Sequence, residues 1–260
     1  SLIRPGVKFI FYPCIPYERN ESPEAGNHYN CPMVTSYAEN IKNNVEALEE
    51  EQVRFMNPFM AFTNEKILTD ALVKEFSSSF QIPAAEIRMA AHAAWQELTT
   101  SREDIKRKGE ETLKWMKEHG RRGIVLAGRP YHVDPEVNHG IDHLITRHGA
   151  AVVTEDSISN RVQKFPTSVL NQWTYHSRLY AAAKYCTTQK DMDLVQLVSF
   201  GCGVDAITTD ETREILQRGN KLYTQLKIDE ITNLGAVNIR LRSLFAALDE
   251  RDEAAAEKSE

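Results

Sequence analysis

The sequence lacks several features that would assign it to a familiar class of protein. It has no excess of positive charge, since 31 Lys and Arg residues stand against 37 Asp and Glu residues, for a formal net charge of −6. A basic surface for nucleic acid is therefore not expected. No apolar run approaches the roughly 20 residues that span a bilayer, and the first residues contain no hydrophobic secretion signal. We expect a cytoplasmic protein whose partners are neither nucleic acid nor membrane, and the missing initiator Met suggests part of a longer polypeptide.

Phosphate-binding and nucleophile motifs are also missing. The segment Gly201-Cys-Gly-Val-Asp lacks the Walker spacing, no G-x-G-x-x-G opens a helix after a strand, and there is no G-x-S-x-G. The sequence contains no ATPase motif, so we do not expect the chain itself to hydrolyse ATP, and whether it is an enzyme stays open. Four cysteines, none of them in a C-x-x-C pair, do not suit a disulfide scaffold and favour a reducing compartment.

The second half of the chain alternates between apolar strands and amphipathic helices. Strands are expected at residues 123–127, 150–154, 194–199 and 221–228. Helices are expected at residues 170–189, 208–216 and 234–248. Thr208 and Glu211 have the spacing of a capping box, which sets the expected start of the second of these helices. This alternation predicts an α/β fold, with a Rossmann-like parallel sheet covered by helices.

The first half is less regular. Strands are expected at residues 7–12 and 53–56, and helices near 64–76, 84–98 and 101–119. Ser36 and Glu39 form a second possible capping box, for a helix whose buried face would carry Ile41, Val45 and Leu48.

These elements suggest four parts of the chain. The last part, rich in acidic residues, is expected to fray into solvent. The parts are an N-terminal α/β segment with Cys14 and Cys31 (1–60), a helical connector or lid (61–121), a Rossmann-like α/β domain with Cys202 (122–250) and an acidic tail (251–260).

Cysteines follow several of the predicted strands. Cys14 comes after the first strand, Cys202 comes after the third strand of the second half, and Cys31 precedes a helix. The carboxyl ends of parallel strands open on one edge of a sheet, so these thiols could share a crevice. Thiolates there would suit an iron–sulfur cluster or zinc, while free cysteines are also common as small buried hydrophobes. Cys186, on an alanine-rich helix, is predicted to belong to the core.

Other reactive side chains follow the same strand ends. In the Gly-Arg-Pro-Tyr-His segment, Arg129 and the turn amides could bind an anion, and Tyr131 and His132 could transfer a proton. Glu155 follows the next strand and is a second acid–base candidate. The alternatives are a rigid loop fixed by Pro130 and a carboxylate that only caps the following segment.

Glycines flank Cys202 on both sides. Gly201 and Gly203 let the backbone turn sharply and leave the surroundings of the sulfur free of side chains. Both are therefore candidates, together with Arg129 and Tyr131, for a cofactor-binding loop.

Several long segments resemble the acyl-CoA dehydratase activase-related proteins. Within that group they resemble the domain of unknown function that follows the activator ATPase domains of the 2-hydroxyglutaryl-CoA dehydratase type. The similarity extends from about Val7 to Leu248. It is carried by the segments FYPCIPYE, NCPMVTSYAENIKNN, GIVLAGRPYHVDPEVNHGI, TEDSI, QWTYHSRLYAAAK, SFGCGVDAITTDETREIL and KIDEITNLGAVNIRLRSL.

The resemblance implies a role in low-potential electron transfer. In such systems an ATP-hydrolysing activator drives an electron into a dehydratase-like partner, whose [4Fe–4S] cluster is held by three cysteines on Rossmann-like domains. It implies that Cys14, Cys31 and Cys202 are the ligands of an oxygen-sensitive [4Fe–4S] cluster, and that Cys186 is not. The partners would be an activator ATPase domain and a dehydratase-like domain or subunit.

Further readings of the same resemblance stay open. An acyl-CoA substrate is one candidate, with His132 and Glu155 as the catalytic groups. The alternatives are a docking scaffold without a cluster, a zinc site on the same thiolates, and a small-molecule enzyme that uses Arg129 and His132 without a metal.

Overall fold

The computed structural model describes most of the chain and divides it into two compact units. The described residues are 6–22, 25–199, 202–228 and 234–257. Unit 1 comprises Ser1–Arg102 and Gln172–Thr174, and unit 2 comprises Glu103–Asn171 and Tyr175–Glu260. The division at Arg102 falls inside one long helix, α4 (Ala84–Glu118).

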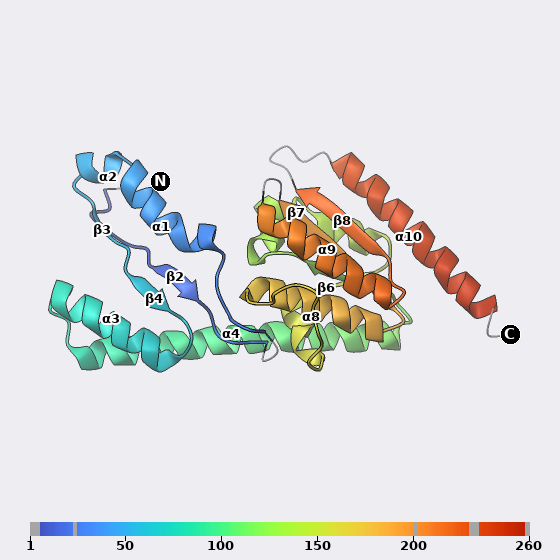
Figure 1. Cartoon of the computed structure of the whole chain (residues 1–260), viewed down its shortest axis with the longest axis horizontal. Helices are drawn as coiled ribbons and strands as arrows, with labels where there is room; N and C mark the ends of the chain where they lie inside the picture. The colour runs from blue at the N-terminus through green and yellow to red at the C-terminus, as the bar shows by residue number, and fades with distance from the viewer. Residues whose placement is uncertain (1–5, 23–24, 200–201, 229–233, 258–260) are drawn as a thin grey trace. The chain divides into compact units, whose positions relative to one another are not determined.

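Unit 2 is built on a parallel four-stranded sheet (Figure 1) with the strand order β6-β5-β7-β8. Its strands are β5 (Gly123–Ala127), β6 (Ala151–Thr154), β7 (Met192–Ser199) and β8 (Tyr223–Ile228). At the centre, Val125 lies opposite Val153 on one side and Leu194 on the other. The predicted Rossmann-like α/β fold is confirmed.

Helices cover both faces of this sheet. They are α5 (Pro135–Asn138), α6 (Ile141–Arg147), α7 (Glu155–Ile158), α8 (Thr174–Thr188), α9 (Gly203–Arg218) and α10 (Leu234–Glu257). Because successive side chains of a strand point to opposite faces, Leu194 packs into a cluster with α4, α8 and α9, whereas Val195 packs into a second cluster with α6 and α10. The sheet is therefore the middle of three layers.

The last helix corrects the prediction of a frayed acidic tail. Helix α10 continues through Glu257. Arg251 forms an ion pair with the fully buried Asp193 at 2.7 Å, and Asp252 forms one with Arg122 at 2.7 Å. These ion pairs hold the charged end of α10 against unit 2.

Unit 1 contains two short pairs of parallel strands. The strands are β1 (Phe9–Phe11), β2 (Cys14–Tyr17), β3 (Arg54–Met56) and β4 (Phe59–Ala61), paired as β1 with β3 and β2 with β4. The helices of unit 1 are α1 (Pro32–Asn44), α2 (Ala47–Glu50), α3 (Glu65–Phe80) and the first part of α4. The strands predicted around Phe9 and Phe55 are confirmed, while β2 and β4 were not predicted.

Both predicted capping boxes were wrong, for one shared reason. Helix α1 starts at Pro32 with Cys31 as its N-cap, and α9 starts at Gly203 with Cys202 as its N-cap. Cysteine is not a typical N-cap residue, so the nearest downstream capping pattern in the sequence was taken instead. Thr208 lies inside α9, where its hydroxyl donates to a backbone carbonyl four residues earlier.

Two further helix predictions need correction. The predicted break between residues 98 and 101 does not exist, because α4 is continuous and the Thr99 hydroxyl donates to the Trp95 carbonyl within the helix. The expected buried face after Cys31 is also wrong. Ile41 is only partly buried, Val45 is 38% exposed, and Leu48 belongs to the separate helix α2.

Candidate functional site

Cys202 lies where β7 gives way to α9. Strand β7 ends at Ser199, and Cys202 is the N-cap of the 16-residue helix α9. A Cβ atom built on Gly203 would meet no atom of the described residues within 4 Å, so those residues leave the first turn of α9 open. Gly201, the other predicted loop glycine, lies outside the described residues.

Arg129 holds the sulfur of Cys202. The residue follows β5 on the neighbouring strand, and its Nη2 donates to Cys202 Sγ at 2.7 Å and to Asp205 Oδ1 at 2.8 Å. Burial opposes the charge of Arg129, but the hydrogen bond and the negative charge of Asp205 outweigh it and raise the pKa of the guanidinium. The second oxygen of Asp205, Oδ2, is buried and has no hydrogen-bond partner among the described residues. The site thus pairs a permanent cation with a thiol and keeps one buried acceptor oxygen.

His132 folds back under this site. Its Nδ1 accepts a hydrogen bond from the Arg129 backbone N–H at 2.9 Å, so the ring proton must lie on Nε2, which donates to Ser199 Oγ at 2.9 Å. Burial, followed by the charge of Arg129, lowers the pKa of His132 to about 4. A Cβ atom on Gly128 would lie 2.3 Å from Nδ1, so only glycine leaves room for this ring. The neutral imidazole therefore positions Arg129 and Ser199.

Tyr131 lies at the surface of the same cluster. Its hydroxyl is 3.2 Å from Ser199 Oγ, and its side chain is 43% exposed. The structure thus brings Tyr131 and His132 together on Ser199, and Arg129 together with Cys202. Their predicted roles in proton transfer and cofactor binding stay predictions.

Glu155 lies at the end of the next strand, β6. Burial, together with the nearby charge of Asp156, raises its pKa to about 8, so the carboxyl group is protonated at neutral pH. A hydrogen bond with the backbone of Gly128 and the charge of Arg178 oppose this shift. A buried, protonated carboxyl group next to β5 suits proton donation, and its catalytic role also stays a prediction.

His176, on α8, also borders this region. Its side chain is 7% exposed, and burial followed by the charge of Arg129 lowers its pKa to about 4. Because His132 and His176 are both neutral, the charged groups of the site are the Arg129 guanidinium and Asp205.

The other two candidate ligand cysteines belong to unit 1. Cys31 is the N-cap of α1 and is 8% exposed, while Cys14 opens β2 and is 1% exposed. Burial, followed by the charge of Glu39, raises the pKa of Cys14. Among the described residues, no three His, Cys, Asp or Glu side chains form a group that could hold a metal ion. The predicted three-cysteine ligand set is therefore still a prediction.

Cys186 behaves as predicted. Its side chain is fully buried in the core cluster beneath α8. Burial and the charge of Asp193 raise the pKa of the thiol. The prediction of a core cysteine is confirmed.

Three residues of the site escaped the sequence reasoning. Asp205 was missed because the start of α9 was placed too late, which hid an acidic residue in the first turn of that helix. Ser199 ends β7, and Gly128 directly follows β5. Their positions at the carboxyl ends of two apolar strands were the signal in the sequence that could have identified them as residues of the site.

Taken together, unit 2 is a Rossmann-like α/β domain that carries an arginine-bound thiol beyond the end of a central strand. The model of the family described as CoA enzyme activase uncharacterised domain matches residues 1–158, more than half of the chain, and the chain belongs to this family. The resemblance found in the sequence is thereby confirmed. The matched region ends with α7 and does not reach Cys202.

The remaining comparisons add no relative. Neither the comparison with curated proteins nor the one with solved structures gave a match. Within the described ranges, no helix has the length and apolar character needed to cross a membrane.

Proposed function

We propose that this chain binds a [4Fe–4S] cluster through the thiolates of Cys14, Cys31 and Cys202 and carries low-potential electrons in a CoA enzyme activase system. The family supports the system, and the three cysteines come from the resemblance described above. When bound, such a cluster supplies one-electron transfer at low potential.

The observation that carries the proposal is the use of cysteine as the N-cap of two helices. Ser, Thr, Asp or Asn at an N-cap accepts a backbone N–H and is worth about 1 kcal/mol. Neither Cys31 nor Cys202 makes such a hydrogen bond. Both thiols nevertheless lie at the positive end of a helix dipole, which favours an anionic group. Cysteine at these two positions is explained by metal binding better than by helix stability.

The surroundings of Cys202 fit a thiolate ligand. Arg129 donates to its sulfur at 2.7 Å, and hydrogen bonds to the sulfurs of a cluster help to set its reduction potential. The cationic donor also offsets part of the negative charge of a thiolate-bound cluster. Arg129 is therefore proposed to hold the ligand and to tune the potential.

The Cys14 thiol should make the binding of the cluster dependent on pH. Burial and Glu39 raise the pKa of this thiol, and a thiol must lose its proton to bind a metal. Cluster binding should therefore release a proton at Cys14 and become weaker as the pH falls.

The proposed partners follow from the family and the absence of an ATPase motif in the chain. Electrons would arrive from an ATP-driven activator domain and leave to a dehydratase-like domain or subunit in the cytoplasm. An acyl-CoA substrate that uses His132 and Glu155 would extend the same proposal.

Anaerobic purification with iron and sulfide reconstitution tests the proposal. The expected result is a brown chain with stoichiometric iron and acid-labile sulfide and an EPR signal after reduction. C14A, C31A and C202A should each lose iron and sulfide, whereas the matched control C186A should retain them. Stoichiometric zinc without sulfide would indicate a zinc site instead of the cluster, and a colourless, metal-free chain would leave the docking scaffold and the small-molecule enzyme that works without a metal.

A second variant tests the role of Arg129. R129Q should still bind the cluster, because the thiolates are unchanged, but its midpoint potential should be more negative because a cationic donor to Cys202 is lost. An unchanged potential would contradict the tuning role of Arg129 and leave the ligand assignment intact.

A further inference from the structure

The two edge strands of the sheet in unit 2 differ in how they are protected from pairing with another chain. At β8, Arg240 of α10 donates to the outward carbonyl of Gln225 at 3.0 Å, and Lys227 is exposed on the strand. Charged side chains of this kind protect an edge strand from pairing with another chain. Within the described part of the chain, β6 at the opposite edge pairs only with β5.

Backbone groups of β6 are free along this edge. The Ala151 N–H donates to the Arg122 carbonyl at 2.9 Å, so Ala151 and Val153 direct their backbone groups at β5. The backbone groups of Val152 and Thr154 then point away from β5. The Thr154 carbonyl accepts the Ser157 hydroxyl at 2.7 Å. Among the described residues, the Val152 N–H and carbonyl and the Thr154 N–H are left without a partner, and such groups favour an added strand.

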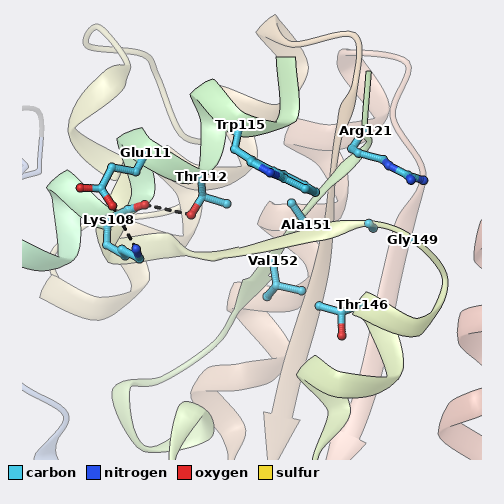
Figure 2. Close-up of a pocket in the computed structure, with 10 residues that line it drawn as sticks. Lys108, Glu111, Thr112, Trp115, Arg121, Thr146, Gly149, Ala151 and Val152 are labelled. Atoms are coloured by element: carbon cyan, nitrogen blue, oxygen red, sulfur yellow. Dashed lines mark hydrogen bonds and ion pairs between the residues drawn. The ribbon is translucent and has the colours of Figure 1, made fainter. Parts of the chain in front are cut away.

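Hollows lie on both sides of this strand. The larger hollow, of about 590 Å³, follows the edge of the sheet from Trp115 and Arg121 on the α4 side to Val152 and Thr146. The α6-side hollow, of about 360 Å³, is lined by Asp142 and again by Val152 and Thr146. In Figure 2, Trp115 lies on the α4 side of β6 while Thr146 and Val152 lie on the other side. A strand added at β6 would direct alternate side chains into the two hollows.

Each hollow has a charged side chain that makes no ion pair within the described residues, and the two charges have opposite signs. On the α4 side, Lys108 and Glu111 form an ion pair at 3.0 Å, while the Arg121 guanidinium has no ion pair or hydrogen bond within the described residues. On the α6 side, the Asp142 carboxylate likewise has none among the described residues. Arg121 lies just before β5, at the amino end of the sheet. Asp142 lies in the first turn of α6, which follows the carboxyl end of β5.

We propose that β6 is a docking edge for an extended segment of a partner protein, which adds as a fifth strand. The segment carries an acidic side chain that faces Arg121 and a basic side chain that faces Asp142. Because these charges lie on opposite faces of the sheet, the residue numbers of the two side chains in the segment differ by an odd number. The exposed indole of Trp115, 46% accessible, packs against an apolar side chain of the segment.

A strand fits these features better than a small ligand does. The hollows lie on opposite sides of one strand, and the free backbone groups lie between them, so a compact ligand would fill one hollow and leave the backbone unpaired. Strand addition satisfies the backbone and uses both hollows, as in β-augmentation by peptides. The proposal does not depend on cluster binding.

NMR titration with defined peptides tests the proposal. The probes are the blocked hexapeptide Thr-Glu-Val-Thr-Lys-Val and its charge-reversed partner Thr-Lys-Val-Thr-Glu-Val, which cover both strand directions. The control Thr-Glu-Val-Lys-Thr-Val has the same composition with both charges on one face. One of the two probes should bind at least about threefold more tightly than the control, from two exposed charge pairs, with saturable shifts at the Val152 and Thr154 amides. No saturable shift with either probe, or equal binding of the control, would overturn the proposal.

Two variants and a modified peptide locate the contact. V152P removes an outward N–H without touching the β5 ladder and should abolish binding, since proline is accepted on an edge strand. R121A should remove the preference over the control peptide, whereas R147A, an exposed arginine of α6 outside both hollows, should keep it. The tighter probe N-methylated at alternate amides should not bind the unmodified chain, which tests the backbone contact even if V152P fails to fold. Binding of the N-methylated peptide at undiminished affinity would overturn strand addition.

Discussion

The two units of this chain use the same kinds of element but are held together differently. In unit 2, consecutive residues of β7 such as Leu194 and Val195 are fully buried on opposite faces of the sheet. Both clusters of buried apolar side chains in the described part of the chain consist of residues of unit 2, and unit 1 contributes none to them. Burial of apolar area is the main stabilising contribution to folding, so we expect unit 2 to be the more stable unit.

The polar contacts show the same contrast. In unit 2, Asp193 is fully buried and accepts two hydrogen bonds from Arg251, at 2.7 and 3.1 Å. In unit 1, Asp70 is paired with Lys66 and Arg88 at the surface. A buried charge depends on its partner, whereas an exposed charge keeps its water. The loss of Asp193 in unit 2 should therefore lower stability much more than the loss of Asp70 in unit 1.

The largest expected effect comes from Asp193. D193A leaves Arg251 and the buried Lys221 without their counter-charge, which should lower the free energy of unfolding by about 3–5 kcal/mol. D70A in unit 1 should cost much less, because its ion pairs are exposed. Hydrogen exchange measured by mass spectrometry can report β7 and α3 separately. Equal losses of protection in the two units would contradict the difference in burial.

The second effect is a pH dependence confined to unit 2. The folded-state pKa of Glu155, about 8, lies above its usual value, so this carboxyl binds more protons in the folded state. Its contribution to stability is present at low pH and is lost as the pH rises through about 8. Between pH 6.5 and 8, the contribution of Glu155 to the free energy of unfolding should fall by about 1 kcal/mol per pH unit.

Denaturant titrations across this window test the assignment. His132 and His176 act in the opposite direction at the acid end of this window, because they are neutral in the folded state but lose their protons near pH 6.5 in the unfolded state. The difference in free energy of unfolding between the unmodified chain and E155Q removes their contribution, and this difference should carry the slope, because glutamine does not titrate. A slope that persists unchanged in E155Q would assign it to another group.

Much of unit 2 could be predicted from its sequence, and the reason is its burial. Strands with apolar residues at every position, such as Gly123–Ala127, occur in sheets covered on both faces. The positions of Arg129 and Cys202 beyond neighbouring strand ends followed from the parallel order. Their hydrogen bond did not follow, because it depends on the start of α9, which a cysteine N-cap concealed.

Unit 1 was harder to predict because its strands are short and only partly buried. Strand β2 contains Pro16 and β4 follows Pro58, and proline argues against a strand in a sequence pattern. The continuity of α4 through Thr99 was also hidden, since hydroxyl residues commonly mark helix ends. Tertiary contacts such as the stacking of Arg19 on Trp95, 3.9 Å from the ring centroid, are not encoded in local spacing.

A third prediction concerns the cysteines of the reduced, metal-free chain. Cys202 is half-buried beside the open first turn of α9, whereas Cys186 is fully buried and its pKa is raised by burial. Iodoacetamide at neutral pH should therefore modify Cys202 at least about tenfold faster than Cys186. Peptide mapping by mass spectrometry measures both rates in one sample. Equal rates would contradict the difference in burial, because they would mean that the reagent reaches Cys186 in the core as readily as it reaches Cys202.

The smallest effect compares two helix N-caps within unit 1. Asn64 caps α3 by accepting the Ile67 N–H at 3.0 Å, so N64A should lower stability by about 1 kcal/mol. Cys31 makes no side-chain cap hydrogen bond to α1, so C31A should reduce the protection of the first-turn amides less than N64A does, although it also removes a buried thiol. Hydrogen exchange of the first-turn amides of α3 and α1 reports each helix separately in the metal-free chain. A loss in C31A as large as that in N64A would show that Cys31 is kept for helix stability, which would remove the main support for its role as a metal ligand.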